Sequence, residues 1–73
     1  MKPNYIKDWY FTKTITGAVQ LHGTIYNDAK RRFRDGTPIA TSRVLVADLV
    51  TGVVQTKNTT YNLDLGVYGV DGT

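Results

Sequence analysis

AVQLHGTIY, residues 18–26, alternates apolar and polar side chains along its whole length. One face would carry Val19, Leu21, Gly23 and Ile25, and the other Gln20, His22, Thr24 and Tyr26. Alternation with period two, in a segment rich in β-branched and aromatic residues, is typical of a strand with one buried face. The stretch therefore predicts a half-buried strand with its single histidine on the polar face.

The preceding segment shows the same pattern. Residues 9–16 place Trp9 and Phe11 on one face and Tyr10 and threonines on the other, which predicts another strand. Residues 1–8 contain Pro3 and an asparagine, and both residue types discourage regular structure. We therefore expect an N-terminal arm over residues 1–8.

The second half of the chain contains further strand signals. Pro38 fixes its own φ angle and disfavours helix before it, so an extended segment is expected there. The most apolar run follows, and we expect the core to cover one of its faces and a neighbouring subunit the other. A turn at Thr51 and Gly52 predicts a hairpin. The expected strands in this half are residues 37–41, 43–50, 53–57 and 60–65.

These elements predict one all-β domain spanning residues 1–73, with five or six short strands. At most one helical turn is expected, over residues 28–32, with Asp28 as its cap. The number and spacing of strands match a small barrel of the SH3, Sm or OB type. Residues 66–73 are either a flexible tail or, as we favour, a segment that docks on a neighbouring chain.

The small size of the chain limits what can stabilise it. A domain of 73 residues buries only about 60% of the surface that its unfolded chain exposes, so its core is marginal. The chain has no cysteine and one histidine, which excludes disulfides and multi-histidine metal sites. Self-association remains as the expected support, and we predict a homo-oligomer.

Membrane insertion and export are not expected from the sequence. No run approaches the roughly 20 apolar residues that a membrane helix needs. The first residues lack the apolar segment of a signal peptide. We therefore expect a cytoplasmic protein with no membrane partner.

Positive charge is concentrated in the middle of the chain. The net charge is +3, from nine basic and six acidic residues, and five of the basic residues fall within residues 30–43. Such a cluster attracts phosphate groups. An equally weighted alternative is a loop whose charges only keep the protein soluble.

The candidate ligand-binding residues follow from this cluster. Guanidinium groups bind phosphate oxygens through paired hydrogen bonds, and hydroxyl groups add uncharged donors. Either Tyr26 or Phe33 is expected to stack on a base, although Phe33 has the alternative role of anchoring the loop to the core. The candidates are Arg31, Arg32, Arg34 and Arg43 for phosphate, Thr37, Thr41 and Ser42 for hydroxyl contacts, and Tyr26 and Phe33 for stacking.

Catalysis is not expected. Nucleophilic catalysis needs a nucleophile beside a base, and His22 has no acid or nucleophile near it in sequence. Asp28 and Asp35 have turn-forming roles that compete with a catalytic one. We predict a protein that is not an enzyme, with no catalytic residues, no cofactor and no metal.

Four segments carry a resemblance to a known class of proteins. They are GTIY (23–26), RFRDGTPI (32–39), TSRV (41–44) and TKNTTYNL (56–63). Together they resemble a pattern in small phage and prophage accessory proteins. Proteins of this kind often oppose host immunity, some by inhibiting a defence complex and others by sequestering its nucleotide signal as oligomeric sponges. The resemblance implies a cyclic oligonucleotide or an ADP-ribose derivative as ligand, held near a subunit interface.

Three functional hypotheses remain open from the sequence. The first is a homo-oligomeric anti-defence protein that sequesters a phosphate-containing nucleotide. The second is an Sm- or SH3-like protein that binds nucleic acid. The third is a protein-interaction module that inhibits a host defence complex through the apolar run and the C-terminal residues.

Overall fold

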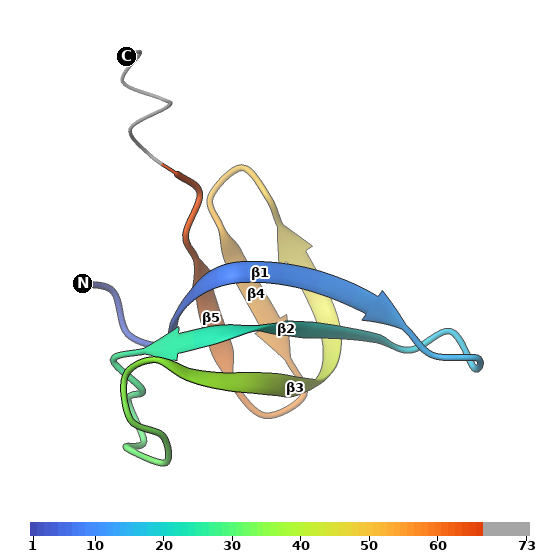
Figure 1. Ribbon diagram of the computed structural model, residues 1–73. Helices are drawn as coiled ribbons and strands as arrows, with labels where there is room; N and C mark the ends of the chain where they lie inside the picture. Colours follow the sequence, from blue (N-terminus) through green and yellow to red (C-terminus); the bar gives the residue numbers. More distant parts are fainter. Residues whose placement is uncertain (67–73) are drawn as a thin grey trace.

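The computed structural model describes residues 1–66, which form a closed barrel of five strands (Figure 1). Its strands are β1 (Tyr5–Lys13), β2 (Val19–Tyr26), β3 (Thr37–Asp48), β4 (Val53–Thr56) and β5 (Thr60–Leu63). Each strand pairs antiparallel with the next, and β1 closes the barrel by pairing parallel with β5. This consecutive order differs from the Greek-key order of an OB-fold. The prediction of a small all-β barrel is confirmed.

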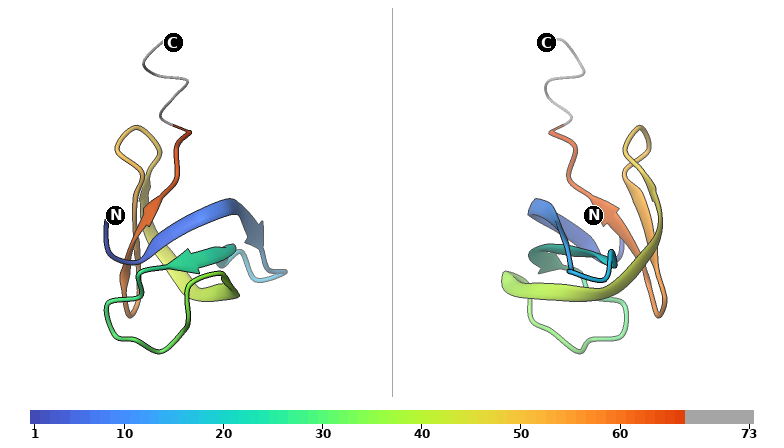
Figure 2. Two further views of the ribbon diagram at one scale, coloured as in Figure 1. Left: turned by 60° about the vertical axis from the view of Figure 1, so that its left-hand side comes forward. Right: turned by 90° about the vertical axis from the view of Figure 1, so that its right-hand side faces the viewer.

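The strands form two layers that cross each other (Figures 1 and 2). One layer holds β1, β2 and the first half of β3, and the other holds the second half of β3 with β4 and β5. Strand β3 belongs to both layers because residues 37–43 pair with β2 and residues 44–48 pair with β4. The β1–β2 hairpin projects from the barrel on the side away from the loop between β2 and β3 (Figure 1).

The core between the layers is small. Its buried apolar members are Ile6, Leu21, Ile25, Val54, Tyr61 and Leu63. Four partly buried residues pack against them, namely Trp9, Phe11, Ile39 and Val44. None of the described residues forms a helix that could span a bilayer.

The prediction of an N-terminal arm is wrong for residues 5–8, because these residues form the first part of β1. The reason is tertiary, because Ile6 is fully buried and its carbonyl accepts a hydrogen bond of 2.8 Å from the Asp64 N–H. The same strand ends at Lys13 instead of residue 16. Residues 14–17 form the hairpin turn, in which the Thr14 N–H donates to the Ala18 carbonyl at 2.8 Å.

Two other expectations about elements are corrected by the structure. The segments 37–41 and 43–50 form a single twelve-residue strand, β3, which ends at Asp48. Leu49 and Val50 lie in the turn beyond it, where the Gly52 N–H donates to the Asp48 carbonyl at 2.8 Å. The helical turn expected over residues 28–32 is not formed. The expected docking of the C-terminal tail concerns residues 67–73, which lie outside the described part.

A glycine in the middle of β2 allows β1 to bend over it. The β1–β2 register shifts between Lys7 and Tyr10, and Asp8 has a φ angle of 52° at this bulge. A Cβ atom on Gly23 would collide with the Ile6 side chain and lie 2.9 Å from the Lys7 carbonyl oxygen. Position 23 therefore has no room for a side chain, which explains an otherwise unfavourable glycine within a strand.

We expect Gly23→Ala to lower the free energy of unfolding by about 1–3 kcal/mol, because β1 must move away from β2. Urea unfolding followed by Trp9 fluorescence would measure this loss. Gly36→Ala is the control, because nothing lies within 4 Å of its added Cβ and only its φ of 89° opposes the change. The Gly36→Ala loss measures the cost of a positive φ angle alone, and a Gly23→Ala variant as stable as the parent chain would contradict the steric explanation.

Candidate functional site

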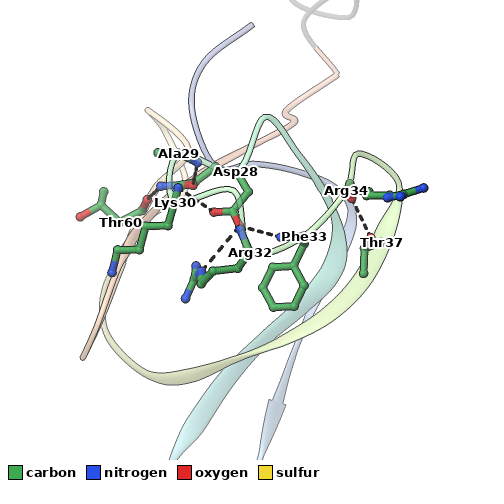
Figure 3. Close-up of polar contacts among 9 residues, drawn as sticks. Asp28, Ala29, Lys30, Arg32, Phe33, Arg34, Thr37 and Thr60 are labelled. Atoms are coloured by element: carbon green, nitrogen blue, oxygen red, sulfur yellow. Dashed lines mark hydrogen bonds and ion pairs between the residues drawn. The ribbon is translucent and has the colours of Figure 1, made fainter.

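The loop between β2 and β3 is built around the carboxylate of Asp28. Its Oδ2 accepts hydrogen bonds from the backbone N–H groups of Arg32 at 2.7 Å and Phe33 at 3.0 Å. Its Oδ1 accepts a further one from the Lys30 N–H at 3.3 Å (Figure 3). We call residues 27–36 the basic loop. Asp28 thus fixes the loop by capping its N–H groups, although no helix follows it.

The charge of this carboxylate is stabilised where it lies. The Asp28 side chain is only 1% exposed, and its Oδ2 lies 3.6 Å from the Arg32 Nε. Burial alone would raise the pKa of Asp28, but the three backbone hydrogen bonds and Arg32 outweigh it and hold that pKa below its ordinary value. Asp28 is therefore an ionised structural anchor for the loop.

The charged side chains of the basic loop do not point one way. Lys30 and Arg32 extend to the same side, while Arg34 extends to the opposite side beside Thr37 (Figure 3). The Thr37 hydroxyl donates a 2.6 Å hydrogen bond to the Arg34 carbonyl, so it closes the turn. The loop borders a shallow hollow of about 710 Å³ lined by Asn27, Asp28, Arg31, Arg32, Phe33, Arg34 and Asp35.

Phe33 lies on the loop without entering the core. Its side chain is 39% exposed, and the Arg32 guanidinium carbon lies 5.4 Å from the centre of its ring. The core cluster and the side chains packed on it do not include Phe33. This position fits a ring that is available at the surface better than one that anchors the loop to the core.

The other predicted residues lie further along β3. Thr41 is buried, and its hydroxyl accepts from the Leu21 N–H at 3.1 Å and donates to the Ser42 carbonyl at 2.8 Å. Thr41 therefore stabilises the irregular β2–β3 pairing from inside. The Ser42 Oγ accepts a 2.8 Å hydrogen bond from the Asn58 side chain, and Arg43 is exposed.

The predicted residues therefore fall into two groups. Thr37 and Arg43 are six residues apart on one extended strand, a separation of roughly 20 Å. The basic loop precedes the Thr37 end of this span, and Arg43 lies at the other end, where it pairs with Gln20 of β2. The hollow beside the basic loop gathers the four contiguous candidates Arg31, Arg32, Phe33 and Arg34, but the four candidates on β3 do not line it.

The turn between β4 and β5 bridges the two groups. The Lys57 N–H donates to the Arg43 carbonyl at 3.0 Å. Lys57 and Lys30 also line one hollow of about 510 Å³, together with Pro3, Asn4, Ala29, Gln55, Thr56, Asn58, Thr59, Thr60 and Asn62. We call Arg31, Lys30, Lys57 and Arg43 the basic track. Sequence reasoning missed Lys57 because only the barrel places it beside the β3 strand.

Within residues 1–66, no acidic side chain forms an ion pair with a member of the basic track. The one ion pair within residues 1–66 joins Arg32 to Asp28. Four carboxylates accept backbone N–H groups in loops and turns, namely those of Asp28, Asp35, Asp48 and Asp64. The other eight basic side chains of the described part therefore form no ion pair.

One aromatic pair is exposed near Arg43. Tyr10 is 57% exposed and stacks on His22, with ring centres 4.9 Å apart and planes 5° apart. The His22 Nε2 lies 2.7 Å from the Thr12 hydroxyl. Arg43 pairs with Gln20, which lies on the same face of β2 two positions before His22.

The other candidate aromatic residues are less available. The Tyr26 ring is covered by Lys7, whose Nζ lies 5.2 Å from the ring centre. Tyr61 is buried. Trp9 packs against the core and donates a 2.7 Å hydrogen bond from its Nε1 to the Asp64 carbonyl. Tyr10 and Phe33 are therefore the exposed aromatic candidates for stacking, whereas the sequence predicted Tyr26 or Phe33.

Comparison with known proteins finds no family model, curated sequence or solved structure that matches this chain.

The capping role of Asp28 predicts a specific acid sensitivity. The carboxyl group titrates near 3.9 when unfolded and lower when folded, so its stabilisation is complete above 3.9 and is lost as pH falls through the folded pKa. We expect Asp28→Asn to lower stability at pH 7 by about 1–3 kcal/mol, with a smaller difference from the parent in acid.

Urea unfolding at a series of pH values from 7 downward would measure this dependence. Asp8→Asn is the matched control, because Asp8 is exposed and asparagine tolerates its positive φ angle equally well. A loss in Asp28→Asn that stayed constant down to the lowest pH would contradict the role of its charge.

Proposed function

We propose that this protein binds the phosphate groups of an oligonucleotide without converting it. The observation that supports the proposal most directly is the basic track, whose four members form no ion pair within residues 1–66. Lys30 and Lys57 line one hollow, Arg31 follows Lys30 in the chain, and the Lys57 N–H bonds to the Arg43 carbonyl. Unpaired Lys and Arg side chains in a row bind phosphates of a strand and release its counterions.

The surroundings of the track fit this ligand. Asn58 and Gln55 contribute amide groups to the hollow that Lys30 and Lys57 share. Tyr10 offers an exposed ring on which a base of the same strand can stack, and its partner His22 lies two positions along β2 from Gln20, which pairs with Arg43. Both hollows are open and shallow, a shape that suits an extended strand better than an enclosed small molecule.

Two kinds of oligonucleotide, a cyclic one and a single strand of nucleic acid, present the phosphates and bases that this surface would bind. The resemblance to phage accessory proteins implies a cyclic oligonucleotide, a host immune signal that the protein would sequester. Single-stranded nucleic acid is the other source, and the roughly 20 Å between the basic loop and Arg43 favours it, because this span covers several phosphates. We propose the single strand as ligand and treat the cyclic signal as the second candidate.

The salt dependence of binding distinguishes the two ligands. Four phosphate contacts on a single strand predict a slope of log K against log salt of about −3, or roughly a 50-fold loss between about 50 and 200 mM. Fluorescence anisotropy with a labelled oligothymidylate would measure it, and calorimetry with a cyclic dinucleotide provides the comparison. Tight, weakly salt-dependent binding of the cyclic dinucleotide alone would assign the site to the signal molecule.

Charge reversal on the track is expected to abolish most of the binding. Arg31→Glu with Lys57→Glu should weaken oligothymidylate binding at least about tenfold, because two phosphate contacts become repulsions. Lys13→Glu is the control, since Lys13 is exposed at the end of β1 on the projecting hairpin. A folded double variant that binds as tightly as Lys13→Glu would refute the proposed site.

Stacking is tested separately at the aromatic pair. Tyr10→Ala should weaken oligothymidylate binding by about 1–3 kcal/mol if one base stacks on this ring. Tyr26→Ala should have little effect, because Lys7 already covers the Tyr26 ring. The reverse order of the two effects would place the stacked base at Tyr26, which is one of the two rings that the sequence predicted.

A further inference from the structure

The second half of β3 has one open edge. Residues 44–48 pair with β4 on one side, and within residues 1–66 no strand pairs with their other side, because β2 pairs only with residues up to Arg43. We call residues 44–48 the apolar edge. Exposed strand edges offer free backbone donors and acceptors, and they template pairing with another strand.

The side chains on and near this edge are apolar and exposed. Leu45 and Val46 are each 57% exposed, and Val50 in the following turn is 88% exposed. Leu49 and Val53 add to the same hairpin, so it exposes five large apolar residues where the whole core buries six. Natural edges are normally protected by lysine or proline, and the apolar edge contains neither. A patch of this kind marks an interaction surface.

We propose that the apolar edge pairs with the apolar edge of a second copy of this chain, antiparallel and about a twofold axis between Leu45 and Val46. In this register Val44 of each copy lies opposite residue 47 of the other. The two β3–β4 hairpins then form a continuous sheet across the dimer, with their exposed leucine and valine side chains beside one another.

Charge complementarity favours a second copy in this orientation. The edge is preceded by Arg43 and ends at Asp48, so antiparallel pairing places Arg43 of each copy opposite Asp48 of the other. Both backbone hydrogen bonds to the Asp48 side chain go to its Oδ1, which leaves its second oxygen for a cation. A parallel arrangement would instead place like charges opposite each other.

The small core supplies a reason for self-association. Six buried apolar side chains are few for an independent domain, and a chain of this size gains from burial between subunits. The dimer does not rest on oligonucleotide binding. Three members of the basic track, Arg31, Lys30 and Lys57, lie outside the proposed interface, so ligand binding and association fail separately.

Sedimentation velocity over a range of protein concentrations tests the interface. The parent chain should show a monomer–dimer equilibrium, and Val46→Lys should raise its dissociation constant at least about tenfold by placing charge at the edge. Ile15→Lys is the matched control: Ile15 is fully exposed in the β1–β2 turn, and its replacement should leave the dimer unchanged. A parent that stays monomeric, or equal effects of the two lysines, would overturn the proposal.

The register of the two edges in the dimer is tested by a charge-reversal variant and by amide hydrogen exchange. Arg43→Glu should weaken the dimer, because it faces Asp48 of the partner, whereas Arg31→Glu should not. Hydrogen exchange should show protection of residues 44–48 that increases with protein concentration. If these amides were protected while the protein had the mass of a monomer, residues 67–73 of the same chain would be the segment that pairs with the edge. That result would overturn the proposal of a dimer.

Discussion

Ile6 is fully buried beside the bulge where β1 bends over β2, and it occupies the space that a side chain at position 23 would need. The same part of β1 pairs with β5, and the Asp64 N–H donates a hydrogen bond to the Ile6 carbonyl. The barrel is closed only through this short parallel pairing, because the β1–β5 ladder has two residue pairs. The position of the basic loop depends on it as well. Asn4, just before β1, accepts from the Ala29 N–H at 2.9 Å and donates to the Thr60 carbonyl at 3.0 Å.

Acidic and basic side chains have separate roles in this molecule. Asp28, Asp48 and Asp64 accept backbone N–H groups, and these hydrogen bonds hold the pKa of each below its ordinary value, against burial that acts to raise it. The carboxylates therefore fix loops and turns, and among them only Asp28 also pairs with a cation, Arg32, within residues 1–66. A chain with a net charge of only +3 thereby presents lysines and arginines that are free to bind an anion. The positive surface therefore arises because most of the carboxylates accept backbone N–H groups, and not because the chain has a large excess of basic residues.

The membership of β3 in both layers has two consequences. It brings Arg43, which ends the half of β3 that pairs with β2, beside Lys57 of the other layer. The candidate site that we propose is therefore an extended track and not the pocket expected from the sequence. It also leaves residues 44–48 paired on one side, which exposes the apolar edge. The same bend thus gives the molecule one charged surface for a ligand and one apolar surface for a second copy, as we propose.

The sequence alone determined the class of fold, because alternation with period two is a local property that survives in any arrangement of the strands. It also located the turn at Gly52, where a positive φ angle occurs as glycine predicts. The tertiary structure decided what depends on contacts between distant residues. Tyr5 and Ile6 became part of a strand because β5 pairs with them, and Thr41 turned inward because the Leu21 N–H needed an acceptor. Lys57 joined the basic track for the same reason: its neighbour Arg43 is distant in sequence and adjacent only in the folded barrel.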